Sequence, residues 1–511
     1  MKKKVDAIVI GAGLGGLSAA ACLANGGLDT LLLERHNIPG GYATSFVRGR
    51  YEFEVALHEL SGIGAPGQRG ATHRYLESIG VAQRVDFVQA PTLYRSVYPG
   101  LDLTLPTGFA GYEQVMRRAF PDDADGISRF LELCRSFGRE LANMQKVGLH
   151  NVFSPLTAVQ IPLRFPKVLR YGHATFWDVL VRYVKDPLAR GVLAQFWGYF
   201  GLPPQRCAFT YFGLGLATYI KRGATYMKGR SQALSQAFID ALEERGGEAR
   251  FNCGVSRILT EGGKVTGVVT EEGEEIHADW VVSNADPLTT CKDLVGRRNV
   301  PEKFFRSLQP STVAPSTVNV YLGVARTPEQ LGLTDHEIFI NDDLDFERQF
   351  EQAKTLEAPA AIAVTCYNHV LPDISPPGTS MVVLTALKFG KAWHAVRPED
   401  YHETKHRIGD CMLKSAARVA PDLRKYAEVV EVSTPLTNVR YSGNLGGSIY
   451  GFNNDPGRHT MWRTPQRGPL GGLYFAGAWT QPGGGFEPVM MSGGMAAGAI
   501  LHRAGKTKEV A

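Results

Sequence analysis

The chain has few cysteines and no long apolar segment. Both features limit the classes of protein to which it can belong. Seven cysteines are scattered over 511 residues, and no two of them form a CxxC pair. This pattern is typical of reduced thiols in the cytoplasm and argues against a disulfide framework, a zinc ribbon or an iron–sulfur site. No uninterrupted apolar run reaches the roughly 18 residues of a transmembrane helix. A signal peptide is an alternative for the first residues, but Asp6 interrupts their apolar stretch. We therefore expect a cytoplasmic protein.

An excess of one charge is also missing. The formal net charge is only +5, from 55 basic and 50 acidic residues, and the basic residues are dispersed. Nucleic acid is therefore not an expected partner. Charged residues make up 21% of the chain and hydrophobic ones 44%, as in ordinary globular proteins. The length allows two domains, and the absence of a low-complexity linker favours interleaved domains over successive ones.

What the chain does contain is a glycine-rich turn near its start. The segment Gly11–Gly16 has the sequence GAGLGG, and an apolar run at 7–10 precedes it. A helix with an apolar stripe is predicted from Gly13 to Asn25, and a second apolar run at 31–33 leads to Glu34. This order of strand, turn, helix, strand and acidic residue is the fingerprint of a dinucleotide-binding site.

Each fingerprint position has a physical role. Gly11 makes the tight turn, Gly13 lets the backbone approach a pyrophosphate, and Gly16 lets the helix pack on the strand. The helix N-terminus offers free N–H groups and a partial positive charge to the diphosphate. The Glu34 carboxylate can accept from ribose hydroxyls and would repel a 2′-phosphate. The site therefore indicates FAD or NAD, and not NADP.

A second glycine-rich region near the end of the chain is expected to meet the same cofactor. Residues 472–485 end in three glycines, and a helix is predicted to follow Pro488. The turn brings backbone close to the cofactor, and the helix directs its N-terminus to the same place. Both ends of the chain are thus predicted to lie against one flavin.

Five further motifs match one flavoprotein family: Pro39–Ser45, Tyr51–His58, Val281–Asp286, Gly446–Gly451 and Leu473–Gly485. With them, the chain resembles the family of bacterial phytoene desaturases, carotenoid isomerases and retinol saturases nearly end to end. The resemblance implies an α/β fold, a Rossmann-like FAD-binding domain with an inserted α+β substrate domain, as in amine-oxidase-like flavoproteins.

The resemblance also implies the domain ranges. The FAD-binding domain is expected to be discontinuous, with residues 1–110, 226–300 and 441–511. Residues 111–225 and 301–440 are expected to form the substrate-binding domain, which includes candidate membrane-facing helices.

The cofactor is expected to be FAD without a covalent link, since no motif indicates a flavinylated His or Cys. In the family, the Gly-Gly loop and the final glycines flank the diphosphate and flavin, and the strand at Val255 lies by the adenine. The fingerprint and the resemblance together predict FAD contacts at Gly11, Gly13, Leu14, Gly15, Gly16, Glu34, Arg35, Gly40, Gly41, Tyr42, Ala43, Val255, Gly477, Ala478, Phe486, Glu487 and Val489.

Departures from the family pattern leave the reaction direction open. Glu54–Ala56 stand where the family often has Asp-x-Gly, and His58 resembles the retinol saturase members. Pro482–Gly485 resemble the desaturases, but Glu487 lies where desaturases usually carry an apolar segment. Glu487 is our first candidate for a catalytic proton donor or acceptor and His58 the second. The alternatives are that Glu487 caps the last helix and that His58 is structural.

These observations predict an FAD-dependent oxidoreductase acting on carbon–carbon bonds of a long hydrophobic isoprenoid or polyene. Desaturation is the first expectation, followed by saturation and cis–trans isomerisation. The electron acceptor is open between quinone and oxygen. Two alternatives share the fold: an FAD-dependent amine oxidase, and a non-catalytic prenyl-binding escort protein.

Residues 402–406, with the sequence HETKH, match the HExxH pattern of zinc sites. Charged neighbours place this helix face in solvent, and no third ligand follows at the required spacing. We therefore predict a surface helix and no metal.

Residues 161–190 combine aromatic and aliphatic side chains with Arg164, Lys167 and Arg170. Such a mixture suits a helix that lies in a membrane interface and admits a lipid substrate, with the protein peripheral at the inner face of the membrane. The alternative is that the apolar residues, including Ile161 and Leu163, form the core of the substrate domain.

Overall fold

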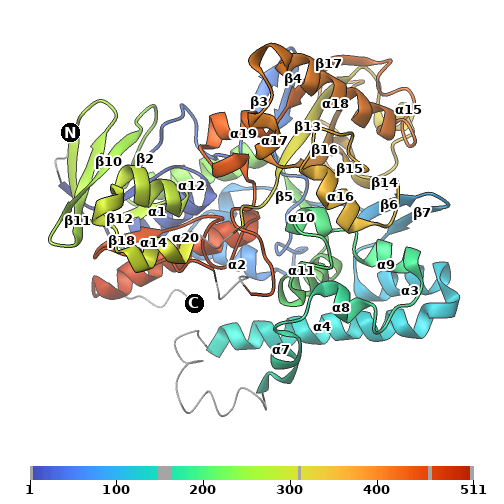
Figure 1. Ribbon diagram of the computed structural model, residues 1–511, viewed down its shortest axis with the longest axis horizontal. Helices are drawn as coiled ribbons and strands as arrows, with labels where there is room; N and C mark the ends of the chain where they lie inside the picture. Colours follow the sequence, from blue (N-terminus) through green and yellow to red (C-terminus); the bar gives the residue numbers. More distant parts are fainter. Residues whose placement is uncertain (1–3, 148–163, 309–311, 458–462, 507–511) are drawn as a thin grey trace.

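Two seven-stranded sheets organise the protein. The computed structural model describes residues 4–147, 164–308, 312–457 and 463–506 (Figure 1). One sheet, with the helices packed on it, forms one end of the molecule. The second sheet and a layer of helices form the other end.

The first sheet is built on the strand that precedes the glycine-rich turn. Its order is β10-β11-β12-β1-β2-β9, and β18 pairs with β12. β1 runs parallel to β2 and β12, and β12 runs parallel to β18. β11 and β12 form an antiparallel hairpin. The strands of this sheet are β1 (Lys4–Ile10), β2 (Thr30–Leu33), β9 (Glu248–Arg250), β10 (Val255–Glu261), β11 (Lys264–Thr270), β12 (Glu275–Ser283) and β18 (Leu473–Phe475).

The helix after the turn is buried on all sides and not only along the predicted stripe. Every residue of α1 (Leu14–Asn25) from Leu14 to Ala24 is buried. The reason is that α1 packs against α12 (Arg230–Glu244) and against α20 (Phe486–Arg503) from the opposite end of the chain. Small residues in α1 allow this close packing.

The second sheet presents one face to a core and the other to a cavity. Its order is β17-β13-β16-β15-β14-β6-β7. Alternation along each strand places the side chains of Val318, Val320 and Leu384 in a core that includes Ile408 and Met412 of α18. The strands are β6 (Tyr94–Tyr98), β7 (Leu101–Leu105), β13 (Ser316–Val324), β14 (Glu337–Asn341), β15 (Ala361–Cys366), β16 (Ser380–Lys388) and β17 (Ala427–Ser433).

The helices between residues 109 and 222 form a layer that is rich in buried aromatic residues. Phe130, Phe137, Phe176 and Phe209 are fully buried there, and their rings contact one another. The helices are α3 (Phe109–Ala119), α4 (Ala124–Val147), α7 (Pro166–Tyr171), α8 (Phe176–Leu180), α9 (Pro187–Leu193), α10 (Trp197–Phe200) and α11 (Phe209–Arg222).

The remaining elements connect these layers. Two short antiparallel pairs join β3 (Ser45–Arg48) to β4 (Tyr51–Glu54) and β5 (Phe87–Gln89) to β8 (Thr225–Met227). The other helices are α2 (Ala71–Ser78), α13 (Pro287–Thr289), α14 (Glu302–Leu308), α15 (Pro328–Leu331), α16 (Phe346–Ala353), α17 (Gly390–His394), α18 (Tyr401–Ala416) and α19 (Pro435–Ser442). Among the described residues, no helix is long and apolar enough to cross a membrane.

The predicted domain boundaries stay a prediction, with one observation that bears on them. β6 and β7 fall within the predicted first segment of the FAD-binding domain, residues 1–110. They nevertheless pair with each other, and β6 pairs with β14 of the second sheet.

Candidate functional site

The glycine-rich turn adopts a conformation that needs glycine. Gly11 has a φ of +92°, and Gly13 is the N-cap of α1. A Cβ on Gly16 would lie 1.9 Å from the carbonyl oxygen of Gly11. The start of α1, which includes Leu14, therefore packs directly on the turn, and the free N–H groups of the helix lie beside it.

Three glycines from the two ends of the chain surround one side chain. A Cβ on Gly13 would lie 2.6 Å from Nδ2 of Asn284, and a Cβ on Gly15 2.6 Å from its Oδ1. A Cβ on Gly477, whose φ is +104°, would lie 2.8 Å from the same oxygen. The three glycines thus pack around Asn284 at the N-terminus of α1, where the free N–H groups of a helix can bind a diphosphate. The sequence analysis counted Asn284 in a motif but gave it no role.

Glu34 lies beside the turn and fixes its backbone. Its Oε2 accepts a hydrogen bond of 2.6 Å from the N–H of Ala12, and its Oε1 accepts one of 2.7 Å from the N–H of His36. The backbone carbonyl of Glu34 accepts from the N–H of Cys253, two residues before the buried Val255 in β10. Glu34 and Val255 therefore lie at one side of the turn.

Arg35 does not point at this turn in the structure. Its guanidinium is mostly exposed and pairs with the carboxylate of Glu271 at 2.7 Å. An FAD contact from Arg35 stays a prediction, and it would require this surface pair to open.

The Gly-Gly loop folds back onto the fingerprint. The N–H of Gly40 donates to the carbonyl oxygen of Ala12 at 2.8 Å, and a Cβ on Gly41 would lie 3.4 Å from Cα of Gly13. The N–H of Ala43 donates to Gly40 and closes the loop. Tyr42 extends away from it, and its hydroxyl donates to the carbonyl oxygen of Gly447 at 3.0 Å.

A cavity of about 320 Å³ begins beside this loop and extends to the second sheet. Tyr42, residues 55–61 and residues 484–488 line one part of it. Residues of α10, α11, α16 and the second sheet also line it. The cavity thus lies between the final glycines and the second sheet, and Phe486 is one of the residues that line it.

Glu487 lines this cavity at the start of α20. Its Oε2 accepts a hydrogen bond of 2.8 Å from the hydroxyl of Ser61. Burial raises the pKa of Glu487 above its ordinary value, and the bond from Ser61 offsets part of that rise. The N–H of Val489 donates to Gly485, as in the first turn of a helix. Glu487 is therefore a partly buried acid whose pKa is raised.

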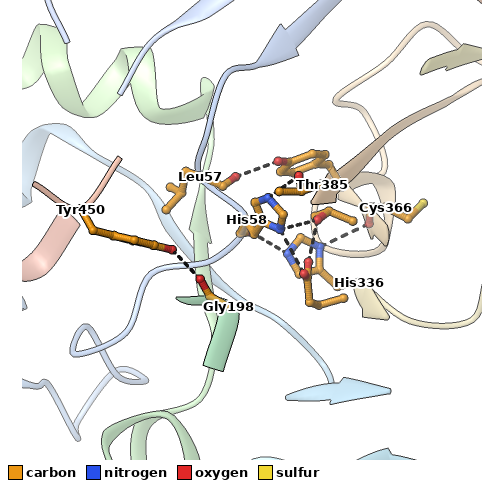
Figure 2. Close-up of polar contacts among 10 residues, drawn as sticks. Leu57, His58, Gly198, His336, Cys366, Thr385 and Tyr450 are labelled. Atoms are coloured by element: carbon orange, nitrogen blue, oxygen red, sulfur yellow. Dashed lines mark hydrogen bonds and ion pairs between the residues drawn. The ribbon is translucent and has the colours of Figure 1, made fainter. Parts of the chain in front are cut away.

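His58 is held by a network of polar groups (Figure 2). Its Nδ1 lies 3.0 Å from Oε1 of Glu337 and 2.8 Å from the hydroxyl of Thr365. Its Nε2 lies 3.0 Å from the hydroxyl of Thr385, and its carbonyl oxygen accepts from Nε2 of His336. Burial raises the pKa of Glu337, but the charge and hydrogen bond of His58 outweigh that effect and leave it lowered. Both ring nitrogens of His58 thus have protein partners.

Glu59, the residue next to His58, was not among the predicted site residues. Glu59 is 5% exposed and lines the cavity. Neither of its carboxyl oxygens has a hydrogen-bond partner among the residues that the structure describes. Burial, and then the charge of Glu337, raise its pKa well above the ordinary 4.5. An acidic residue within the apolar stretch after β4 was the available signal.

The comparisons with known proteins decide the family. The family described as flavin containing amine oxidoreductase matches residues 14–501. The chain belongs to this family. It is therefore a flavin-dependent oxidoreductase, and the predicted fold class and enzyme class are confirmed.

Relatives with assigned names support the more specific resemblance. The all-trans-retinol 13,14-reductase of Homo sapiens is 26% identical, over 93% of this chain and 82% of that protein. The chloroplastic prolycopene isomerase of Daucus carota is 23% identical, over 97% of this chain and 80% of that protein. The predicted relationship to the retinol saturases and carotenoid isomerases is confirmed.

Solved structures confirm the amine-oxidase-like fold of this flavin-containing amine oxidoreductase. An oxidoreductase from Methanosarcina mazei matches with a TM-score of 0.61 and 17% identity, over 98% of this chain and 100% of that one. A putrescine oxidase bound to putrescine matches with a TM-score of 0.64 and 14% identity, over the same shares of the two chains. At these identities the likeness concerns the fold alone.

The segment predicted to face a membrane divides into buried and exposed parts. Phe176, Val179 and Leu180 are buried, as the core alternative expects. In α7, Leu169 is 53% exposed, and Lys167 pairs with Glu140 at 3.2 Å. Ile161 and Leu163 lie outside the described residues.

The HExxH match lies on α18, where His402 and His406 are exposed. Within the described part of the chain, no group of three or more His, Cys, Asp or Glu side chains is placed to hold a metal ion.

Proposed function

We propose that the chain binds FAD non-covalently and acts on a carbon–carbon double bond of a long hydrophobic polyene. The observation that carries the proposal is the cavity that joins the final glycines to the second sheet and that the partly buried acid Glu487 lines. The names of the relatives, a retinol reductase and a prolycopene isomerase, support a polyene as substrate.

The residues that would hold FAD come from both ends of the chain. Gly13, Gly15 and Gly477 would lie against the diphosphate, and Glu34 and Val255 would hold the adenosine side. Tyr42 and Phe486, which line the cavity, would contact the ring system together with Ala478 and Val489. Of the described residues around the cavity none is a cysteine, and both ring nitrogens of His58 are engaged, which supports a non-covalent cofactor.

A bound flavin supplies hydride exchange with a substrate carbon. The chain must then supply or remove a proton at the neighbouring carbon and keep water away. Glu487 can hold that proton because burial favours its neutral form. His58 is the second candidate, although Thr365, Thr385 and Glu337 occupy its ring nitrogens. Without a net proton transfer, the same site would carry out an isomerisation.

We also propose that the protein associates peripherally with the cytoplasmic face of a membrane, from which a polyene could enter. The exposed Leu169, between Arg164 and Arg170 in sequence, supports this proposal. Quinone and oxygen both stay candidates for the electron acceptor.

Anaerobic spectroscopy of the purified, FAD-supplemented protein tests the function. Oxidised protein should bleach with a polyene if it desaturates, and reduced protein should regain its yellow colour with a polyene if it saturates. A panel of polyenes, retinoids and primary amines separates the candidates. Bleaching by amines alone would establish an amine oxidase, and protein that stays colourless with added FAD would establish an escort protein.

A further inference from the structure

Basic side chains from separate segments gather on one part of the surface. Lys221 and Arg222 lie at the end of α11, and Arg135 and Arg139 lie on α4, which packs against α11. Desolvation lowers the pKa of Lys221, and the positive charges of these three arginines lower it further. The four side chains therefore lie close enough to repel one another.

The loop before α2 joins two more arginines to this group. Nη1 of Arg222 donates to the carbonyl oxygen of Gln68 at 2.6 Å. Nη1 of Arg69 donates to the carbonyl oxygen of Gly64, in the same loop, at 2.8 Å. Nη1 of Arg74, on α2, donates to the carbonyl oxygen of Arg69 at 2.8 Å. We call the six side chains together the basic surface: Arg69, Arg74, Arg135, Arg139, Lys221 and Arg222.

Few carboxylates balance the charge of the basic surface. Glu132 pairs with Arg139 at 2.9 Å and with Arg135 at 3.7 Å. Among the residues that the structure describes, the other four members of the basic surface form no ion pair. Arg74 and Lys221 are exposed, as are Arg135 and Arg139. An excess of positive charge of this kind attracts an anionic partner.

The basic surface lacks the apolar side chains that a membrane-inserted face needs. Among the described residues, the exposed large apolar side chains are Val47, Leu169, Val430, Tyr441 and Leu445. None of them lies on α2, on α11 or in the loop between Gly64 and Gly70. A helix in a membrane interface combines basic with exposed apolar residues, whereas an acidic protein surface is recognised by complementary charge. The composition therefore favours an acidic protein over a lipid surface.

The basic surface lies on the outer side of the cavity wall. Thr218 of α11 lines the cavity, and the exposed Lys221 follows it on the same helix. A Cβ on Gly62 would collide both with Oγ1 of Thr72, on α2, and with Oε2 of Glu487. The two helices that carry basic residues thus pack against the part of the wall that holds Glu487. A partner docked there would lie beside the proposed flavin site.

Saturation of one carbon–carbon double bond takes up two electrons and two protons, and the electrons need a donor. The fingerprint at Gly11–Gly16 joins β1 to α1 and is assigned to FAD. Gly62–Gly67 has the same Gly-x-Gly-x-x-Gly spacing, but no strand leads directly into it. The described residues therefore offer no second turn of this kind for a nicotinamide dinucleotide. A protein carrier needs no such turn, because it binds through its surface.

We propose that the basic surface docks an acidic electron-carrier protein that reduces the flavin. The proposal rests on the proposed function for the flavin itself. The carrier is oxidised by two electrons, which pass by way of the flavin to one substrate carbon with a proton from water, as hydride. Glu487 donates the second proton to the neighbouring carbon and recovers it from water. Complementary charge speeds the encounter of the two proteins, so reduction should slow as salt is added.

Stopped-flow reduction of the FAD-loaded protein tests the proposal. The probes are two acidic carriers, a reduced plant-type [2Fe–2S] ferredoxin and a reduced flavodoxin, with dithionite, NADH and NADPH for comparison. At low salt at least one carrier should reduce the flavin, and the second-order rate constant should fall at least about tenfold near 1 M salt. Combining Arg74→Glu, Arg135→Glu and Lys221→Glu should cause a similar loss at low salt, while the flavin absorbance and the rate with dithionite stay unchanged.

The matched control combines Arg245→Glu, Lys303→Glu and Lys414→Glu, three exposed positions outside the basic surface that change the net charge equally. It should keep most of the wild-type rate. No reduction by either carrier, a rate independent of salt, equal losses in the two triple variants, or faster reduction by NADH or NADPH would overturn the proposal. So would a surface variant that loses only its binding to anionic liposomes. In each of these cases the protein stays yellow, whereas protein that stays colourless with added FAD contradicts the proposed function itself.

Discussion

At the scale of single residues, Glu487 gives the sharpest test of the chemistry. Glu487→Gln keeps the shape of the side chain and can still accept from Ser61, but it has no proton to exchange. We expect turnover to fall by about 10²–10⁴-fold, the range of general acid–base catalysis. FAD content should stay near that of the wild type. Single-turnover kinetics and the flavin absorbance of the same preparation measure the two effects separately.

Glu403→Gln, on the exposed face of α18, is the control for Glu487 and should turn over normally. A Glu487→Gln variant with wild-type turnover would mean that Glu487 only caps α20. The proton would then come from His58 or from Glu59, or the reaction would be an isomerisation without net proton transfer.

Glu59 predicts a pH-dependent stability. Its pKa in the folded protein lies well above the ordinary 4.5, so the folded state binds the proton more tightly than the unfolded state. The corresponding stability is complete below pH 4.5 and is lost as the pH rises through the folded pKa. Glu59→Gln cannot ionise and should escape this loss, which is roughly 1.4 kcal/mol per pH unit. Calorimetry of FAD-saturated protein from pH 5 to pH 8 should show that the stability of the variant relative to the wild type increases with pH.

The exposed Glu403→Gln variant again serves as the control, and its difference in stability from the wild type should not change with pH. If the difference in stability between Glu59→Gln and the wild type is also independent of pH, the Glu59 carboxyl ionises freely in the folded state, and burial does not raise its pKa.

The sequence located only those site residues that motifs mark. Glu487 follows a glycine turn and His58 follows a family motif, so both could be named in advance. Glu59 became visible only with the fold, because its burial and its lack of partners among the described residues depend on strands and helices far apart in the chain. The network around His58 could not be predicted either, since Glu337, Thr365 and Thr385 come from three separate strands.

At the scale of elements, the strand–turn–helix unit follows local rules and was predictable. The spacing of Gly11 and Gly13, the helical pattern and Glu34 are all contained in some 30 consecutive residues. The complete burial of α1 was not predictable, because α20 comes from the other end of the chain to cover it.

The same unit predicts the effect of a branched side chain in the turn. Gly13→Val should abolish flavin binding, because its branched side chain would occupy the space that the pyrophosphate needs. Glu34→Ala should weaken FAD binding by roughly 1–3 kcal/mol, the range for a hydrogen bond to a charged group. Equilibrium dialysis with FAD measures both effects.

Gly498→Val is a suitable control for the turn, since a Cβ on Gly498 meets no atom within 4 Å. It should bind FAD normally. Normal FAD affinity in Gly13→Val would show that the cofactor does not lie against this turn.

Helix α7 predicts association with anionic membranes. Leu169 is exposed on it, and Arg164 and Arg170 lie nearby in sequence. The protein should pellet with liposomes, more so when they contain anionic lipid, and less so near 1 M salt, where the Debye length is about 3 Å. Leu169→Glu should reduce pelleting several-fold. The equally apolar and exposed Leu445, changed to Glu, is the control, and indifference of the wild type to lipid and salt would favour the core alternative.

At the scale of the whole molecule, the two ends of the chain are joined in one layer. β18 extends the sheet of β1 through β12, and α20 packs on α1 (Figure 1). The predicted meeting of both ends rested on the glycine motifs. Where the substrate-binding part begins was harder to predict, because β6 and β7 join the second sheet from within the first 110 residues.

This arrangement leads to a prediction about the cofactor itself. A dinucleotide spans the distance from Glu34 and Val255, at one side of the turn, past Gly13 and Gly477, to the final glycines. A mononucleotide would leave Glu34 and Val255 without a ligand. The flavin released by heat should therefore run as FAD. We expect it in the supernatant, because no cysteine is among the described residues that line the cavity and both ring nitrogens of His58 have protein partners.

Chromatography of the heated supernatant against FAD and FMN standards measures this outcome, with the protein pellet as the internal control. A colourless supernatant over a yellow pellet would establish a covalent link and contradict the expectation. Released FMN would contradict the assignment of Glu34 and Val255 to the adenosine side. Glu34 also accepts a hydrogen bond from the N–H of Ala12. If FMN is the cofactor, Glu34→Ala should loosen the turn without changing which flavin is retained. If FAD is the cofactor, the same variant should retain less FAD.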